Sequence, residues 1–88
     1  MKSGTVTLTN KVGLHARPAA ELIKTANKFQ SKITISGRGK EANAKSIIMI
    51  LSLGLRCGDT MSVVAEGPDE QEAVAAIIKL AEEKFHEE

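Results

Sequence analysis

Hydrophobic residues recur along this chain with two different spacings. Stretches that alternate apolar and polar residues, and are rich in β-branched side chains, are typical of half-buried strands. They predict strands over residues 5–9, 32–36, 41–44 and 60–66. Stretches whose apolar residues recur every three or four positions are typical of amphipathic helices. They predict helices over residues 16–29 and 47–53, and a final helix that begins at residues 68–69.

Turn and capping residues mark the ends of several of these elements. The sequence Gly37-Arg38-Gly39 predicts a tight turn between the second and third strands. Gly54 is typical of the residue that follows a helix. At the start of the final helix, Asp69 and Glu72 have the spacing of a capping box. The buried face of that helix is expected to consist of Val74, Ile77, Ile78, Ala81 and Phe85.

The predicted elements follow the order βαββαβα, with no internal repeat, linker or low-complexity tract. This order favours an α+β fold in which helices cover one face of a mostly antiparallel sheet. We expect one domain over residues 1–88, near the lower size limit for a single hydrophobic core. That core must be aliphatic, because Phe29 and Phe85 are the only aromatic residues.

The segment Gly13-Leu14-His15-Ala16-Arg17-Pro18 joins the first strand to the first helix. His15 is expected at the helix start, where the first N–H groups lack internal partners and the helix dipole is positive. Pro18 fits the first turn because its missing N–H is not needed there. Arg17 adds a planar set of donors suited to phosphate oxygens. The combination favours a histidine that accepts a phosphoryl group, although the local pattern is equally typical of an ordinary surface histidine.

Other chemistries have less support in the sequence. A metal site is not expected, because the only other histidine is His86 and the only cysteine is Cys57. No Ser, Asp or Cys stands beside His15 in a recognisable nucleophile pattern. A single cysteine excludes an intramolecular disulfide, and we interpret Cys57 as a small packing residue.

Two motifs decide between the interpretations of His15. Gly-Leu-His-Ala-Arg-Pro, with its histidine at position 15, closely resembles the phosphorylation-site signature of HPr, the histidine phosphocarrier family of the bacterial phosphoenolpyruvate:sugar phosphotransferase system. Asn43-Ala44-Lys45-Ser46-Ile47 resembles the regulatory-serine segment of the same family. The resemblance covers nearly all of the chain. It implies an open-faced β-sandwich, with a four-stranded antiparallel sheet under three helices, which agrees with the order of the predicted elements.

The resemblance also implies a phosphoryl relay without a cofactor. Phospho-enzyme I, charged by phosphoenolpyruvate, would donate its phosphoryl group to Nδ1 of His15, and His15 would pass the group to enzyme IIA domains. The helix N-terminus disfavours a protonated ring and so favours the neutral, nucleophilic form of His15. The N–H groups of Ala16 and Arg17 and the guanidinium of Arg17 are expected to hold the phosphate oxygens. The protein is thus expected to be a carrier rather than an enzyme.

The short helix over residues 47–53 is almost entirely apolar, which is typical of a fully buried helix. The resemblance instead favours an exposed patch that contacts the phosphoryl donor and its acceptors. Helical spacing places Ile50 and Leu53 together on a face that can be buried. We expect the partner surface to contain Leu14, Ala20, Lys24, Lys45, Ile47, Ile48 and Leu51.

Ser46 precedes this short helix, where serine is a preferred N-cap, and capping alone explains its presence. The resemblance adds phosphorylation of Ser46 by a dedicated kinase, removal by a phosphorylase, and recognition by a catabolite-control transcription factor. The two roles are compatible, because a helix N-terminus accommodates negative charge. Two departures from the family pattern leave partner preference open: Met49 replaces a common glycine, and Val12 replaces a small polar residue.

The formal net charge is only +1, but it is distributed unevenly. Through Arg56, ten basic residues face Glu21 and Glu41, a net charge of +8. From Cys57 onward, two basic residues face nine acidic ones, a net charge of −7. Unless folding mixes the two halves, His15 lies in a basic field that attracts acidic protein partners.

The sequence also bears on location and assembly. The N-terminus has no apolar signal-peptide region, and the longest apolar run, residues 47–51, is too short to cross a membrane. We therefore expect a cytoplasmic protein without membrane insertion, acting as a monomer.

Three other functions remain open. A carrier of the nitrogen-related phosphotransfer branch would share His15 and differ in its partners, although Lys45-Ser46-Ile47 and Ser52-Leu53-Gly54 look more like the sugar branch. A non-catalytic regulator acting only through Ser46 would need no nucleophile at position 15. Small RNA-binding domains also share the βαββαβ order, but they stack bases on aromatic strand residues. No predicted strand contains Phe, Tyr or Trp, so nucleic-acid binding is not expected.

Overall fold

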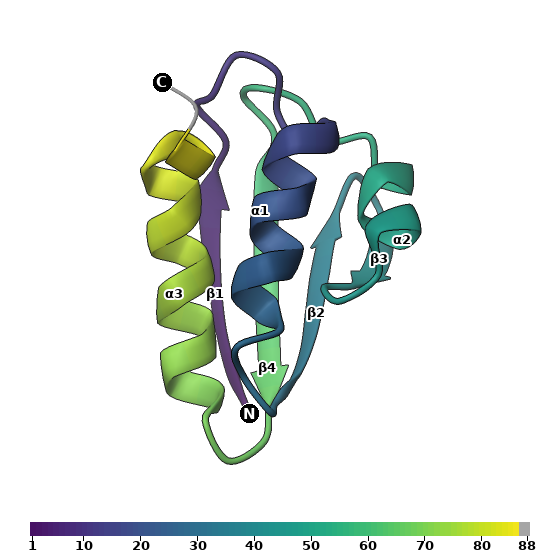
Figure 1. Ribbon diagram of the computed structural model, residues 1–88. Coiled ribbons are helices and arrows are strands. Elements are labelled where there is room, and N and C mark those ends of the chain that lie inside the picture. Colours follow the sequence, from purple (N-terminus) through teal and green to yellow (C-terminus); the bar gives the residue numbers. More distant parts are fainter. Residues whose placement is uncertain (87–88) are drawn as a thin grey trace.

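The computed structural model describes residues 1–86, and its helices and strands occur in the predicted order (Figure 1). The elements are β1 (Lys2–Thr7), α1 (Ala16–Ala26), β2 (Lys32–Gly37), β3 (Lys40–Asn43), α2 (Ile47–Ser52), β4 (Thr60–Glu66) and α3 (Glu70–Glu82). A single short turn, η1 (Lys84–His86), follows α3.

The four strands form one antiparallel sheet in the order β1-β4-β2-β3. The central strand β4 pairs with β1 over the whole length of β1, from Lys2 opposite Ala65 to Thr7 opposite Thr60. All three helices cover the same face of the sheet, and the other face is open (Figure 1). The predicted α+β open-faced sandwich of four antiparallel strands and three helices is confirmed.

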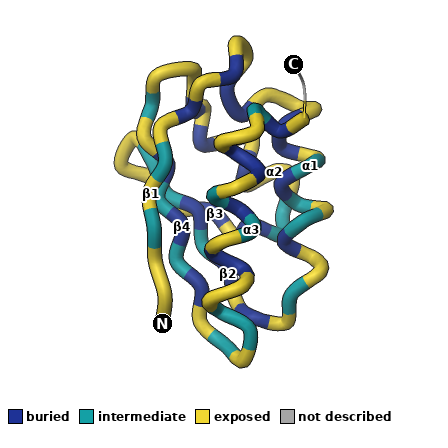
Figure 2. The backbone as a smooth tube through the Cα atoms, turned by 90° about the vertical axis from the view of Figure 1, so that its left-hand side faces the viewer, coloured by how far each residue is buried: buried dark blue, intermediate teal, exposed yellow. Residues whose placement is uncertain are grey.

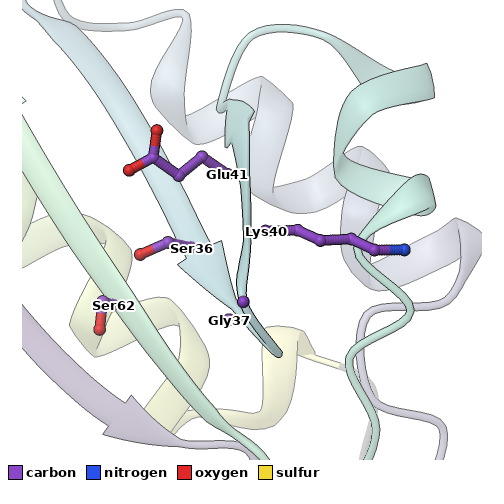
Figure 3. Close-up of a pocket in the computed structure, with 6 residues that line it drawn as sticks. Ser36, Gly37, Lys40, Glu41 and Ser62 are labelled. Atoms are coloured by element: carbon purple, nitrogen blue, oxygen red, sulfur yellow. The ribbon is translucent and has the colours of Figure 1, made fainter.

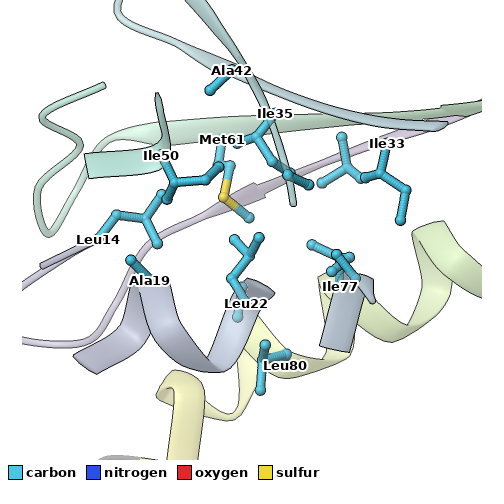
Figure 4. Packing of buried hydrophobic residues seen from close by; sticks show 14 of the residues in the cluster. Leu14, Ala19, Leu22, Ile33, Ile35, Ala42, Ile50, Met61, Ile77 and Leu80 are labelled. Atoms are coloured by element: carbon cyan, nitrogen blue, oxygen red, sulfur yellow. The ribbon is translucent and has the colours of Figure 1, made fainter. Parts of the chain in front are cut away.

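The core lies between the inner face of the sheet and the helices. Along β4, Met61, Val63 and Ala65 are buried while the residues between them are partly exposed, as expected for a sheet covered on one side. Leu22 of α1 and Ile77 of α3 pack against this face (Figure 4). Figure 2 shows the resulting pattern, in which buried positions recur along strands and helices while the connecting loops are largely exposed. The apolar side chains of the core are aliphatic apart from Met61 and Phe85.

Two predicted boundaries are wrong by a few residues. Strand β1 runs from Lys2 to Thr7 rather than over residues 5–9, because the partner β4 offers hydrogen bonds only to that span. Helix α1 ends at Ala26 rather than residue 29. The N–H groups of Lys28 and Phe29 bond three residues back, which tightens the last turn, and Phe29 still packs partly buried against the core.

The end of α3 differs from the predicted continuous helix. The helix stops at Glu82, and Lys84, Phe85 and His86 have positive φ angles of 57°, 55° and 62°. A right-handed helix cannot continue through such residues. This reversed turn nevertheless delivers the Phe85 ring to the core, where it is fully buried. Phe85 is therefore a core residue, as predicted, but not part of a helical stripe.

The predicted capping box at Asp69 is also wrong. Asp69 occupies the N-cap position of α3, but its carboxylate makes no capping hydrogen bond. It accepts instead from the N–H groups of Gln30, at 2.9 Å, and Ser31, at 3.0 Å, and from the Ser31 hydroxyl. The pKa of Asp69 is lowered chiefly by the Ser31 hydroxyl and then by the Gln30 N–H. Asp69 thus ties the start of α3 to the loop before β2.

The predicted turn signals are confirmed. The hairpin between β2 and β3 turns at Arg38 and Gly39, whose φ angles of 53° and 78° suit the two-residue hairpin turn that matches strand twist. Gly54 has a φ of 65° and ends the segment that includes α2. The two glycines at these turns meet no neighbour that an added Cβ would contact within 4 Å.

Candidate functional site

His15 lies at the end of a loop that is anchored firmly on both sides. Leu14 is only 3% exposed and joins the core, while its N–H donates to the carbonyl oxygen of Leu55 at 3.0 Å. Asn10 is buried, and its side-chain amide donates to the carbonyl oxygen of Gly13 at 2.8 Å. The loop before α1 and the loop before β4 therefore lie against each other, at the upper end of the molecule in Figure 1.

Helix α1 begins directly after His15, as the sequence predicts. His15 is exposed, has an extended backbone, and occupies the N-cap position without a capping bond from its ring. Its carbonyl oxygen accepts from the N–H of Ala19 at 2.9 Å. Within residues 1–86, the N–H groups of Ala16 and Arg17 donate to no acceptor, and Pro18 has no N–H. Two unpaired backbone donors therefore stand beside an exposed imidazole, an arrangement that binds anions.

A surface hollow of about 440 Å³ opens beside His15. Its walls come from the loop that precedes α1, from α2, and from the loop that follows α2. The lining residues are Val12, Leu14, His15, Leu51, Gly54, Leu55 and Arg56. Arg56 is distant in sequence from His15, and no local pattern marks it, so sequence reasoning missed its position here.

The predicted phosphate ligand Arg17 lies in the first turn of α1, two residues after His15. Its side chain is exposed and is not among the residues that line this hollow. It makes no hydrogen bond or ion pair with the other residues that the structure describes. Spacing places Arg17, Ala20 and Lys24 on one face of α1, and all three are exposed.

Helix α2 presents an apolar surface next to the hollow. Ile47, Ile48 and Leu51 are exposed, with Ile48 at 78%, whereas Ile50 and Leu53 are buried. The expectation of one exposed and one buried face is confirmed, and full burial of the helix is excluded. Met49, at 43%, adds to the exposed apolar area.

Two residues expected on the partner surface are placed differently. Leu14 belongs to the core, so its role is to anchor the loop under His15 rather than to offer a surface contact. The ammonium group of Lys45 donates to the carbonyl oxygen of Phe29 at 2.8 Å. Lys45 therefore ties the start of α2 to the loop after α1, and it does not line the hollow.

Ser46 caps α2, as the sequence predicts. Its hydroxyl accepts from the N–H of Met49 at 3.4 Å. The hollow lies at the other end of this helix, where Leu51 and Gly54 line it. A helix of six residues is about 9 Å long, so Ser46 is separated from the hollow by that span of α2.

The turn after α2 is fixed by Asp59. Its carboxylate accepts from the N–H of Arg56 at 2.8 Å and pairs with the guanidinium of Arg38 at 3.4 Å. The pKa of Asp59 is lowered chiefly by the Arg56 N–H and further by Arg38. The N–H of Asp59 in turn donates to the carbonyl oxygen of Arg56 at 2.9 Å.

A second hollow, of about 580 Å³, lies on the open face of the sheet (Figure 3). Ser36 stands opposite both Ser62 and Glu41 in the strand register, so their side chains form one polar row. The hollow contains none of the residues predicted for the site. Within residues 1–86, no group of His, Cys, Asp or Glu side chains has the arrangement to hold a metal ion. In the same part of the chain, no helix combines the length and apolarity needed to span a membrane.

The structure is thus a small open-faced α+β domain with an exposed histidine beside unpaired backbone donors at the start of its first helix. Comparison with known proteins identifies its family. The family model described as the PTS HPr component phosphorylation site matches residues 2–83. The chain belongs to the HPr family, the phosphocarrier proteins of the phosphotransferase system.

Individual relatives agree over nearly the whole chain. The phosphocarrier protein HPr of Xylella fastidiosa (strain Temecula1) is 45% identical over 83 residues, which cover 94% of this chain and 93% of the relative. The crystal structure of HPr-C-His from Thermoanaerobacter tengcongensis has a TM-score of 0.95 at 50% identity, covering 100% of this chain and 99% of that one. An HPr dimer from the same organism has a TM-score of 0.77 at 49% identity, covering 97% and 98%.

Proposed function

We propose that this protein accepts a phosphoryl group on His15 from phospho-enzyme I and passes it to enzyme IIA domains that serve sugar uptake. The observation that carries the proposal is the exposed His15 ring beside the two unpaired N–H groups of Ala16 and Arg17. Membership of the HPr family supports the same role.

The proposed transfer is a displacement at phosphorus. The lone pair of Nδ1 of His15 forms a new N–P bond while the N–P bond of the donor phosphohistidine breaks. The His15 ring loses the proton from its other nitrogen to solvent, and the departing donor ring takes up a proton. The N–H groups of Ala16 and Arg17 stabilise the charge on the phosphoryl oxygens. Because these donors are exposed, the stabilisation is modest, which suits a carrier that must also release the group.

Partner contact is assigned to the surface that surrounds His15. It combines the apolar face of α2 (Ile47, Ile48 and Leu51) with the exposed face of α1 (Arg17, Ala20 and Lys24). We infer that the carrier acts as a cytoplasmic monomer, as the family resemblance implies; one relative is described as an HPr dimer.

Regulation is assigned to Ser46. A kinase that phosphorylates Ser46 would place a dianion at the start of α2, within the surface proposed for enzyme I. A phosphorylase would remove it, and a catabolite-control transcription factor would read it. The exposed position of α2 supports this role. The resemblance of the flanking segments to the sugar branch favours sugar transport over the nitrogen-related branch.

The direct test is incubation with enzyme I and phosphoenolpyruvate, followed by intact mass measurement and mild acid treatment. We expect one added phosphoryl group that is lost in acid. The variant His15→Ala should remain folded and unlabelled, because an exposed residue at a helix start contributes little to the core. The control His86→Ala should be labelled like the wild type. Labelling that persists in His15→Ala, or resides on His86, would overturn the proposed function.

A further inference from the structure

The hollow beside His15 contains a cationic side chain with no function assigned so far. Among the seven residues that line it, Arg56 is the only one that carries a permanent charge, and none is acidic. Arg17, the cation nearest in sequence, does not line the hollow. The structure thus brings Arg56, from the loop after α2, into the lining of the same hollow as His15.

The backbone of Arg56 is held in place on three sides. Its N–H and its carbonyl oxygen both bond to Asp59, at 2.8 Å and 2.9 Å. The preceding carbonyl, of Leu55, accepts from Leu14 beside His15. Gly13 approaches so closely that a Cβ built there would lie 2.6 Å from the Cα of Arg56. The position of Arg56 relative to the His15 loop is therefore fixed by packing, which is the condition for a preorganised charge.

The guanidinium of Arg56 is available for a ligand. Its side chain is exposed and makes no hydrogen bond or ion pair with any residue among 1–86. Asp59, the carboxylate that holds the backbone of Arg56, uses one oxygen, Oδ2, for both the Arg56 N–H and the Arg38 guanidinium. The hydrogen bonds that hold this turn thus come from the backbone of Arg56. The N–H donors of its guanidinium have no partner among residues 1–86.

We propose that Arg56 is a second anion-binding side chain of the site, whose guanidinium binds oxygens of the phosphoryl group on His15 from the α2 side of the hollow. The N–H groups at the start of α1 bind the same group from the other side. This inference rests on the proposed phosphorylation of His15. Planar donors suit two oxygens of one phosphoryl group, so Lys at position 56 should replace Arg only in part.

The test uses a chemical donor, so that it does not depend on enzyme I. Potassium phosphoramidate would phosphorylate the chain in a His86→Asn background, which leaves His15 as the single histidine. Phosphorus NMR then follows the ionisation of the phosphoryl group against pH. A bound guanidinium favours the dianion, so Arg56→Gln should raise this pKa by about 0.2–0.7 of a pH unit, the size expected for an exposed pair.

Matched variants separate binding of the phosphoryl group by Arg56 from a general effect of the protein's net charge. Arg38→Gln removes the same side chain from the far side of Asp59 and should titrate like the wild type. Arg56→Lys should lie between the wild type and Arg56→Gln. Arg17→Gln, measured in parallel, reports the contribution of the residue that the sequence favours. Thermal unfolding of each variant checks that the fold is kept.

Each outcome decides the proposal. An unchanged titration in Arg56→Gln overturns it, even where transfer from enzyme I is slowed, because Arg56 is then only a docking charge for partners. An equal shift in Arg38→Gln overturns it as well, since the effect is then one of net charge. A chain labelled by phosphoramidate but not by enzyme I overturns the proposed function alone. A chain labelled by neither donor overturns both.

Discussion

At Gly13 the backbone has a φ of 63°, and a Cβ built there would lie 2.5 Å from the carbonyl oxygen of Leu55. Both facts require glycine, because a left-handed conformation strains other residues and a backbone neighbour cannot move aside. At this contact the loop that carries His15 packs directly against the loop that carries Arg56. The absence of a side chain at position 13 therefore allows these two loops to pack this closely.

The variant Gly13→Ala should consequently be less stable and slower to accept a phosphoryl group. Gly39→Ala is the matched control: it has a φ of 78°, but its Cβ would meet nothing within 4 Å. The control should lose about 1 kcal/mol for its conformation alone, and Gly13→Ala about 3 kcal/mol or more. Urea unfolding and the rate of His15 phosphorylation measure both effects. Equal losses in the two variants would show that the contact with Leu55 is unimportant.

A second prediction at the level of single residues concerns the side chain of Arg17. If its guanidinium holds the transferring group, Arg17→Ala should slow transfer without abolishing it. Loss of one charged hydrogen bond is worth about 1.5–3 kcal/mol, or roughly tenfold to a hundredfold in rate. Lys should rescue only in part, because it supplies charge without the planar donors. Rapid-quench measurement of transfer from phospho-enzyme I checks this, and kinetics equal to the wild type would leave Arg17 as solvated surface charge.

Among the elements, the start of α3 depends on a contact that crosses the molecule. Asp69 holds Gln30 and Ser31, so one carboxylate joins the helix to the loop before β2. The hydrogen bonds from Ser31 and Gln30 lower the pKa of Asp69 from its ordinary value of 3.8. The folded state thus binds this proton less readily than the unfolded chain does. The stability from Asp69 is fully present above the ordinary pKa and is lost as the pH falls through the lower folded value.

Asp69→Asn should therefore lower Tm near neutral pH, and the difference from wild type should shrink below pH 3.8. Glu72→Gln is the control, because Glu72 is exposed and takes no part in this contact. Thermal unfolding followed by circular dichroism across this pH range gives the measurement. A difference in Tm that stays constant with pH would assign the effect to packing rather than to the ionised carboxylate.

Elements whose signals are local could be predicted from the sequence, and contacts between distant segments could not. The Gly37-Arg38-Gly39 turn, the Ser46 cap and the two faces of α2 follow from spacing and residue type, and all three are found. Asp69 has the spacing of a capping box, but its carboxylate accepts a hydrogen bond from the N–H of Ser31 instead of capping α3. Arg56 reaches the His15 hollow only through the packing of two loops, which periodicity does not encode.

The whole molecule keeps much of the charge asymmetry seen in the sequence. Glu70, Glu72, Glu82 and Glu83 lie on or at the end of α3, at the opposite side of the molecule from α2 (Figure 1). The exposed cations Lys11, Arg17, Lys24 and Arg56 lie on or near the His15 loop and α1. An acidic partner would therefore be drawn toward the His15 face and turned away from α3.

Ser46→Asp should accordingly slow phosphorylation of His15 by weakening the encounter with enzyme I. The substitution lies at the far end of α2 from the hollow, so it acts within the partner surface and not on the phosphoryl group itself. Exposed charges are screened over about 8–10 Å at ordinary ionic strength, so added salt should narrow the gap between variant and wild type. Thermal stability should not fall, because aspartate is also a good N-cap.

The measurement is the rate of His15 phosphorylation against salt concentration for both proteins, with Ser46→Ala as the uncharged control. The control should be phosphorylated at the wild-type rate. Inhibition that is independent of salt, or that accompanies partial unfolding, would assign the effect of aspartate to shape rather than charge.

The two ends of the described chain differ in their distance from the site. Met1 is held near the start of α3 by an ion pair between its amino group and Glu70, at the lower end of the molecule in Figure 1. The Nδ1 atom of His86 lies 3.6 Å from a carboxylate oxygen of Glu21, in the second turn of α1, the helix that begins after His15. A surface anchor or fluorescent fusion joined through Met1 would leave the phosphoryl-transfer face turned toward solution. The same label attached at His86 would lie beside Glu21 in the second turn of α1, nearer to His15 than a label at Met1.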